Sequence, residues 1–288
     1  MFLMIPIGLR AQLDPVSLAL KAYTNKDLTK AKELIELAVQ DETHSQRTKT
    51  WYFRGFIHKD LYKNAREEKR FKDAGAHRQT AIESFYKSIE LDEKQELVSE
   101  CNNTLRYLSN TLYNDAAYAL DSNNFELADE YFEKHKSIQS KISPDSDFRP
   151  RQIEFSSYKA SKYSALFEQV SNEQKEEISS KIIDLYKGVL DIDSNNISAN
   201  YNLAIHYYNQ GVNLIENMDY DVDFELIFEI QAQVMDLFGA ALPYMHKAYK
   251  LNPYRKETLV GLSGIYFGLN DIEKSEYYQE ELKKLESE

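Results

Sequence analysis

A recurring spacing of small and large residues is the feature that most constrains the fold of this chain. Near the C-terminus it reads Ala241, Met245 and Ala248, with Pro253 following. Residues four and then three positions apart lie on one face of an α-helix, so each copy places a bulky side chain between two mostly small ones. The other copies are Ala31, Ile35 and Ala38; Ala81, Phe85 and Ser88; Ala128, Phe132 and His135; and, more loosely, Ile182, Tyr186 and Val189. This repetition predicts stacked helical repeats.

The residue usage agrees with long helices joined by short connections. The 288 residues include only nine Gly and six Pro, so sharp turns are few. Apolar residues make up 42% of the chain, which is enough to bury a substantial core.

A second recurring set of residues marks the first helix of a repeat, before the helix that carries the small-large-small spacing. It consists of Trp51, Gly55 and His58; Leu203, Ala204 and Tyr207; and Leu259, Leu262, Ser263 and Tyr266. With these residues the chain resembles the tetratricopeptide repeat (TPR) family over about residues 12 to 288. The resemblance implies an all-α, right-handed superhelical solenoid of about six helix-turn-helix repeats in a single domain.

The number of residues between the last marked residue of the first helix and the first small residue of the second helix predicts the length of the hairpin. In regular copies it is nine residues, as from Ala22 to Ala31. Three copies are longer, so we expect three elongated hairpins that protrude from the array. They run from His58 to Ala81, from Tyr163 to Ile182 and from Tyr207 to Ala241.

Local signals predict several helix boundaries. Asp14 should cap a first hairpin over Pro15–Gln40. The longest hairpin should turn at 219–223 and continue in a helix from Phe224, with a kink or restart near Gly239 because Pro243 lies inside it. A solvated helix over 272–285 should end the array.

The resemblance implies a concave groove lined by the first helices of successive repeats. Large aromatic rings and amides there suit an extended peptide or a helix. The alternative, that several of the aromatic rings pack between adjacent helices, stays open. The residues assigned to the groove are Tyr23, Tyr52, Phe56, Tyr113, Asn114, Tyr201, Asn202, Ile205, Tyr208, Asn209 and Phe267.

Family members that hold the C-terminus of a chaperone use a clamp of Lys, Arg and Asn on these helices. Tyr and Ser occupy most of the corresponding places here, which argues against that ligand.

Several other functions find no support in the sequence. The net charge of −12 would repel a phosphate backbone, so we expect no nucleic-acid partner. Cys101 is the sole cysteine, and the six His show no metal-binding spacing. Asp191, Asp193 and Asn195 begin like a calcium loop, but the Gly and closing Glu of that loop are missing. We predict no catalytic residues, no metal and no cofactor.

The N-terminus resembles the end of a secretory signal peptide. An apolar run covers 2–9, and Ala11 suits the last residue before cleavage. We expect a signal-peptide remnant at 1–11, a repeat domain at 12–288, and a periplasmic or secreted location, with the cytoplasm as the alternative. No later segment is apolar enough to cross a membrane.

Together these observations predict a non-enzymatic scaffold or adaptor that binds a protein segment, with a membrane-associated envelope complex as one setting. Two alternatives stay open. The first is a small-ligand module, for example one that binds glycans through its aromatic rings. The second is an enzyme whose site is assembled from residues distant in sequence.

Overall fold

The computed structural model describes residues 14–218 and 224–287, and within these ranges every regular element is a helix. The backbone divides into two compact units, Met1–Ala116 with Glu126–Ser146, and Ala117–Phe125 with Asp147–Glu288. The predicted signal remnant at 1–11 and the predicted turn at 219–223 lie outside the described residues. No described helix is both long and apolar enough to cross a bilayer.

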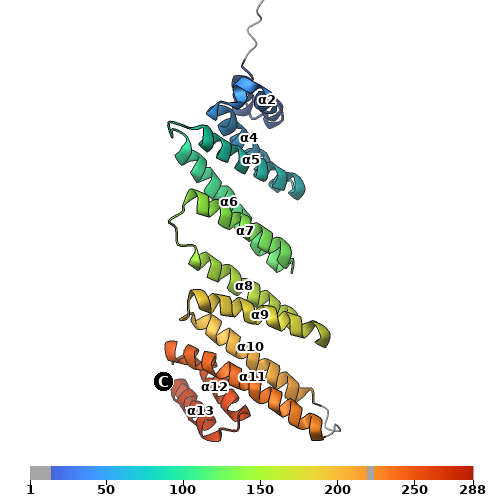
Figure 1. Ribbon diagram of the computed structural model, residues 1–288, viewed down its shortest axis with the longest axis vertical. Coiled ribbons are helices and arrows are strands. Elements are labelled where there is room, and N and C mark those ends of the chain that lie inside the picture. Colours follow the sequence, from blue (N-terminus) through green and yellow to red (C-terminus); the bar gives the residue numbers. More distant parts are fainter. Residues whose placement is uncertain (1–13, 219–223, 288) are drawn as a thin grey trace, which may run out of the picture. The chain divides into compact units, whose positions relative to one another are not determined.

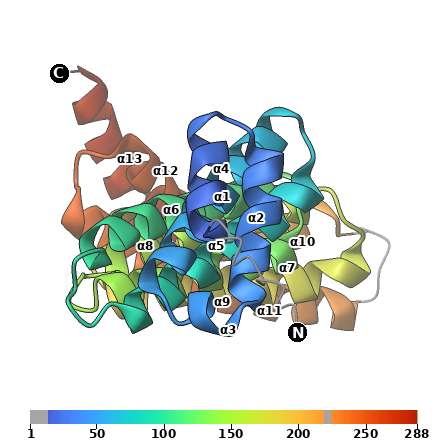
Figure 2. The same ribbon diagram turned by 90° about the horizontal axis from the view of Figure 1, so that it is seen from above.

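The first unit contains hairpins of paired helices, of which α1 and α2 lie side by side in both views (Figures 1 and 2). The Asp14 carboxylate accepts hydrogen bonds from the amides of Val16 and Ser17, which confirms the predicted N-cap. The helices are α1 (Pro15–Thr24), α2 (Leu28–Gln40), α3 (Glu42–Ser45), α4 (Thr48–Glu67), α5 (Phe71–Leu91), most of α6 (Val98–Asp121) and α7 (Phe125–Ile142).

The second unit contains three more hairpins, α8/α9, α10/α11 and α12/α13. Their helices are α8 (Arg149–Phe167), α9 (Asn172–Ile192), α10 (Ile197–Glu216), α11 (Phe224–Leu251), α12 (Lys256–Gly268) and α13 (Ile272–Ser287). With α1/α2, α4/α5 and α6/α7 of the first unit, the described chain therefore forms six hairpins of paired helices, as the spacing predicted.

The helices of the three hairpins predicted to be elongated are long: α4 and α5 have 20 and 21 residues, α8 and α9 have 19 and 21, and α10 and α11 have 20 and 28, whereas α1 and α2 have only 10 and 13. The spacing did not predict the length of α6 and α7, which have 24 and 18 residues although this hairpin was not among the three. The predicted restart near Gly239 is wrong, because α11 runs without interruption through Pro243. Pro243 lies on the exposed face, while Phe238, Ala241 and Met245 hold the helix in the core on either side of it.

The small-large-small copies form the core of the hairpins, as predicted. All fifteen of their residues are at most 3% exposed. In two copies the bulky residue packs where a facing helix carries glycine: a Cβ on Gly55 would lie 2.7 Å from the ring of Phe85, and one on Gly261 would overlap Met245. Glycine at these places lets two helices approach closely.

Phe238 shows this close packing most clearly, because its ring lies between two glycines. A Cβ on Gly211 of α10 would lie 2.6 Å from one edge of the ring, and a Cβ on Gly268 of α12 would overlap the other edge. The Phe238 ring therefore cannot move away from one of these helices without approaching the other.

We predict that Gly211→Ala lowers the free energy of unfolding by about 1 to 3 kcal/mol, the usual cost of overpacking a core. Gly188→Ala in α9 is the matched control, because a Cβ there meets nothing within 4 Å. It should raise the stability by about 1 kcal/mol through helix propensity. Urea unfolding midpoints at constant m-value measure both effects, and equal shifts for the two variants would contradict the packing described for Phe238.

Candidate functional site

A cavity of about 260 Å³ lies between α8 and α10, the first helices of two consecutive hairpins. Tyr186, the central residue of the small-large-small copy on α9, also lines this cavity. The remaining lining residues are Ser161, Ser164, Phe167 and Glu168 of α8 and Asn202, Ile205, His206 and Asn209 of α10.

Neutral hydrogen-bonding groups dominate this cavity. The hydroxyl of Tyr186 is hydrogen-bonded to Asn202 and Ser164. Burial raises the pKa of Tyr186 and these hydrogen bonds oppose the rise, so the phenol is un-ionised at neutral pH. The amides of Asn202 and Asn209 add both donors and acceptors. Glu168 adds a carboxylate at the cavity's edge, and the other polar groups of the lining are neutral donors and acceptors.

His206 borders the cavity and is 8% exposed. Its Nε2 lies 2.9 Å from the hydroxyl of Ser179, and its ring meets the ring of Phe167 edge to face at 5.2 Å. Burial lowers the pKa of His206 to about 4. At neutral pH the imidazole is uncharged.

The Ser179 and His206 pair lacks two features of a serine activated by a general base. Ser179 is itself buried, and its hydroxyl also lies 3.0 Å from the side-chain oxygen of Gln210. A histidine with a pKa of about 4 is a weak base at neutral pH, where a general base works best with a pKa near the ambient pH. Among the described residues no group of three His, Cys, Asp or Glu side chains could hold a metal ion.

Three of the residues assigned to the groove from the sequence meet in this cavity: Asn202, Ile205 and Asn209. Others on α10 and α12 do not. The guanidinium of Arg255 lies 3.7 Å from the centre of the Tyr201 ring, and Tyr208 stacks on the buried ring of Phe238. These two rings pack between helices, which was the alternative left open.

Of the assigned residues on α1 and α4, one lines a cavity and two pack against the core. Tyr23 donates a 2.5 Å hydrogen bond to Asp60 and lines a separate cavity of about 630 Å³. Tyr52 and Phe56 pack against the core, where the ring of Phe56 meets that of Phe85 at 5.1 Å.

On α6, the ring of Tyr113 lies beside those of Phe132 and His135, while Asn114 is exposed. On α12, Phe267 is 67% exposed. The eleven assigned residues therefore do not line one continuous cavity.

The sequence reasoning missed the α8 side of the cavity, although a signal for it was present. Ser161, Ser164 and Glu168 have the same three-then-four spacing as Asn202, Ile205 and Asn209. Tyr186 was assigned to packing alone, and nothing in the spacing indicated that its hydroxyl would reach the cavity.

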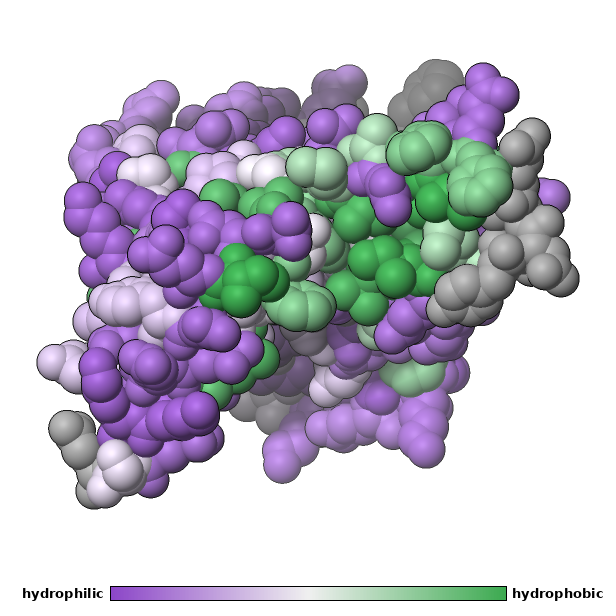
Figure 3. Space-filling view, turned by 90° about the horizontal axis from the view of Figure 1, so that it is seen from below, coloured by the Kyte–Doolittle hydropathy of each residue, from purple (hydrophilic) through white to green (hydrophobic). Residues whose placement is uncertain are grey.

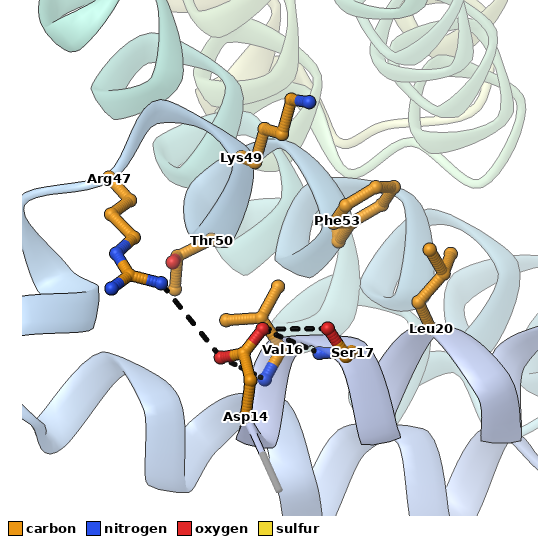
Figure 4. Close-up of a pocket in the computed structure, with 8 residues that line it drawn as sticks. All are labelled: Asp14, Val16, Ser17, Leu20, Arg47, Lys49, Thr50 and Phe53. Carbon is orange, nitrogen blue, oxygen red and sulfur yellow. Dashed lines mark hydrogen bonds and ion pairs between the residues drawn. The ribbon is translucent and has the colours of Figure 1, made fainter.

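A second cavity, of about 280 Å³, lies between α1 and the start of α4 in the first unit (Figure 4). Its main charges already interact with one another, because Asp14 caps α1 and pairs with His44 at 2.8 Å and with Arg47 at 4.0 Å. The hydroxyl of Thr50, which also lines it, has no hydrogen-bond partner among the described residues.

No protein-family model matches the chain, and neither does any curated protein. Among solved structures it is similar to MamA protein, at 13% identity and a TM-score of 0.38 over 81% of this chain and 92% of MamA. It is also similar to the human IFIT1 dimer with m7Gppp-AAAA, at 13% identity and a TM-score of 0.37 over 89% of this chain. The chain spans only 46% of that IFIT1 chain. Similarity at this level carries no argument about binding or activity.

The buried His206 predicts a pH-dependent stability. Its pKa is about 4 in the fold against an ordinary value of 6.5, so below pH 6.5 the unfolded chain binds the proton more readily than the folded one. Stability should therefore fall between pH 6.5 and about 4, by at most about 3 kcal/mol from this group. His206→Gln should remove that part of the fall, as measured by urea unfolding at pH 7.5 and pH 4.5.

The value at pH 7.5 controls for lost packing, because the histidine is neutral there in both states. The lowered pKa of His77 affects wild type and variant alike. If the two proteins lose the same stability between the two pH values, the neutral state assigned to His206 is wrong.

Proposed function

We propose that this protein is a non-enzymatic scaffold that binds an extended segment of a partner protein along the first helices of its hairpins. The observation that carries the proposal is the α8–α10 cavity, where the evenly spaced residues of two consecutive first helices face a shared space. A groove built from such helices presents side chains at the same spacing on successive hairpins, which suits an extended chain that contacts more than one hairpin.

The chemistry of the cavity fits a peptide. A peptide backbone offers alternating donors and acceptors, and the side chains of Asn202, Asn209 and Ser161 can satisfy both kinds. Ile205 and Phe167 add apolar surface for one side chain of the ligand.

The cavity has a volume of about 260 Å³, which is room for one anchored side chain of such a peptide.

We extend the proposal to an envelope location, on the strength of the apolar run at 2–9 followed by Ala11. Fractionation of cells that express the full chain tests this part. Recovery of the shortened protein in the periplasm or the medium would support it, and recovery of the unprocessed protein in the cytoplasm would contradict it.

Peptide display against the whole chain should enrich a family of binding sequences. We expect Asn202→Ala with Asn209→Ala to weaken the best peptide about tenfold or more, because the ligand's backbone groups would lose their partners. Isothermal titration calorimetry measures the affinity, and circular dichroism verifies that the variant is folded.

Asn110→Ala is the matched control, since Asn110 is an exposed asparagine of α6 outside this cavity. Its affinity should equal that of wild type. Equal binding by the cavity variant would remove this cavity from the mechanism. Stabilisation by soluble oligosaccharides without any peptide binding would favour the small-ligand alternative instead.

A further inference from the structure

The first half of α11 extends beyond the hairpin that packs on its second half. Gly268, the last residue of α12, packs on Phe238 of α11. Helix α11 begins at Phe224, so it continues for 14 residues past this contact, while α12 and α13 have only 13 and 16 residues in all. At 1.5 Å per residue the extension is about 21 Å long, and it is visible at the lower end of Figure 1.

One face of α11 is covered in its second half and bare in its first. Residues seven apart lie on the same face of a helix, and Phe228, Met235, Leu242 and Tyr249 follow this spacing. Leu242 packs into the core of the unit, and the ring of Tyr249 meets that of Tyr278 in α13 at 5.5 Å. Phe228 and Met235, further along the same face, are 68% and 55% exposed.

Phe224 lies on this face as well and is 78% exposed. We call Phe224, Phe228 and Met235 the α11 apolar stripe. The face of the molecule seen from below shows a continuous area of hydrophobic side chains (Figure 3). Exposed apolar surface of this kind marks an interaction site more often than it occurs by chance.

Carboxylates follow the open edge of the stripe. Glu225, Glu229 and Asp236 come one position after each stripe residue, about 100° around the helix, and all three are exposed. The whole segment 188–246 contains nine Asp and Glu and neither Lys nor Arg. The segment that carries the stripe is therefore strongly acidic.

We propose that the α11 apolar stripe docks an amphipathic helix of a partner protein that carries Lys or Arg along one edge of its apolar face. The stripe spans twelve residues, so about three turns of a helix cover it. The basic residues would pair with the carboxylate row, and apolar side chains would occupy the place that α12 and α13 leave uncovered. A second copy of this segment would bring carboxylates together and is disfavoured by charge.

This surface is separate from the α8–α10 cavity. The side of α11 opposite the stripe, with Leu226, Ile230 and Leu237, lines another cavity of about 670 Å³ towards α8 and α10. The two proposals can therefore fail independently.

Two designed 18-residue helical peptides test the proposal with the full chain. Both carry the same Leu stripe, and one has Lys where the other has Glu at the flanking positions. By fluorescence anisotropy we expect the Lys peptide to bind at least about tenfold more tightly than the Glu peptide, and the difference to shrink with added salt.

Paired variants then locate the binding surface. Phe224→Ser with Phe228→Ser should weaken the Lys peptide about tenfold or more, while Phe71→Ser, at a residue 60% exposed on α5, should not. Glu225→Lys with Glu229→Lys should reverse the preference to the Glu peptide. The charge control, Glu93→Lys with Glu96→Lys, changes exposed residues of the first unit.

Equal binding of both peptides, or binding that survives loss of both Phe side chains, would overturn the proposal. So would self-association of the wild type in sedimentation that Phe224→Ser with Phe228→Ser abolishes, because the occupant would then be a second copy. Intact binding of selected peptides to the α8–α10 cavity in these variants would show that only the stripe proposal is affected.

Discussion

The close approach of two helices around one bulky side chain is the interaction on which the rest of this structure depends. It is clearest in two places: Phe85 fills the space left by Gly55, and Phe238 fills the space between Gly211 and Gly268. Because little free space is left around the bulky side chain, each such contact limits how its two helices can pack. The first helices consequently keep a regular exposed face, and the α8–α10 cavity is one product of that regularity.

Hairpin length is a second, independent variable. Adding residues on both sides of a turn extends a hairpin without disturbing the copies that hold its base, as α10 and α11 show. Where the next hairpin is shorter, apolar side chains of the extended part are left exposed. Phe228 and Met235 are exposed although they continue the face that buries Leu242 and Tyr249, because α12 ends at Gly268.

The chain's many aromatic residues serve mainly to fill the space between helices. Tyr208 stacks on Phe238, and Tyr266, Tyr278 and His246 form a cluster of rings at the C-terminal hairpin. At the α8–α10 cavity, burial keeps His206 neutral at physiological pH. The resulting cavity chemistry favours recognition by hydrogen bonds over acid–base catalysis.

The sequence by itself determined the helical hairpins, their number and the lengths of most of them, because the packing spacing and the distances between its copies are local properties of the chain. It did not predict the 24 residues of α6. It also brought Asn202, Ile205 and Asn209 together, since they lie on one face of one helix. Only the tertiary structure decided that Ser161 and Ser164 face these residues and that Tyr201 and Tyr208 pack between helices. It also decided that α11 extends beyond the end of α12. These outcomes depend on which helix faces which, and side chains such as Tyr208 and Asn209 are adjacent in sequence but meet different neighbours.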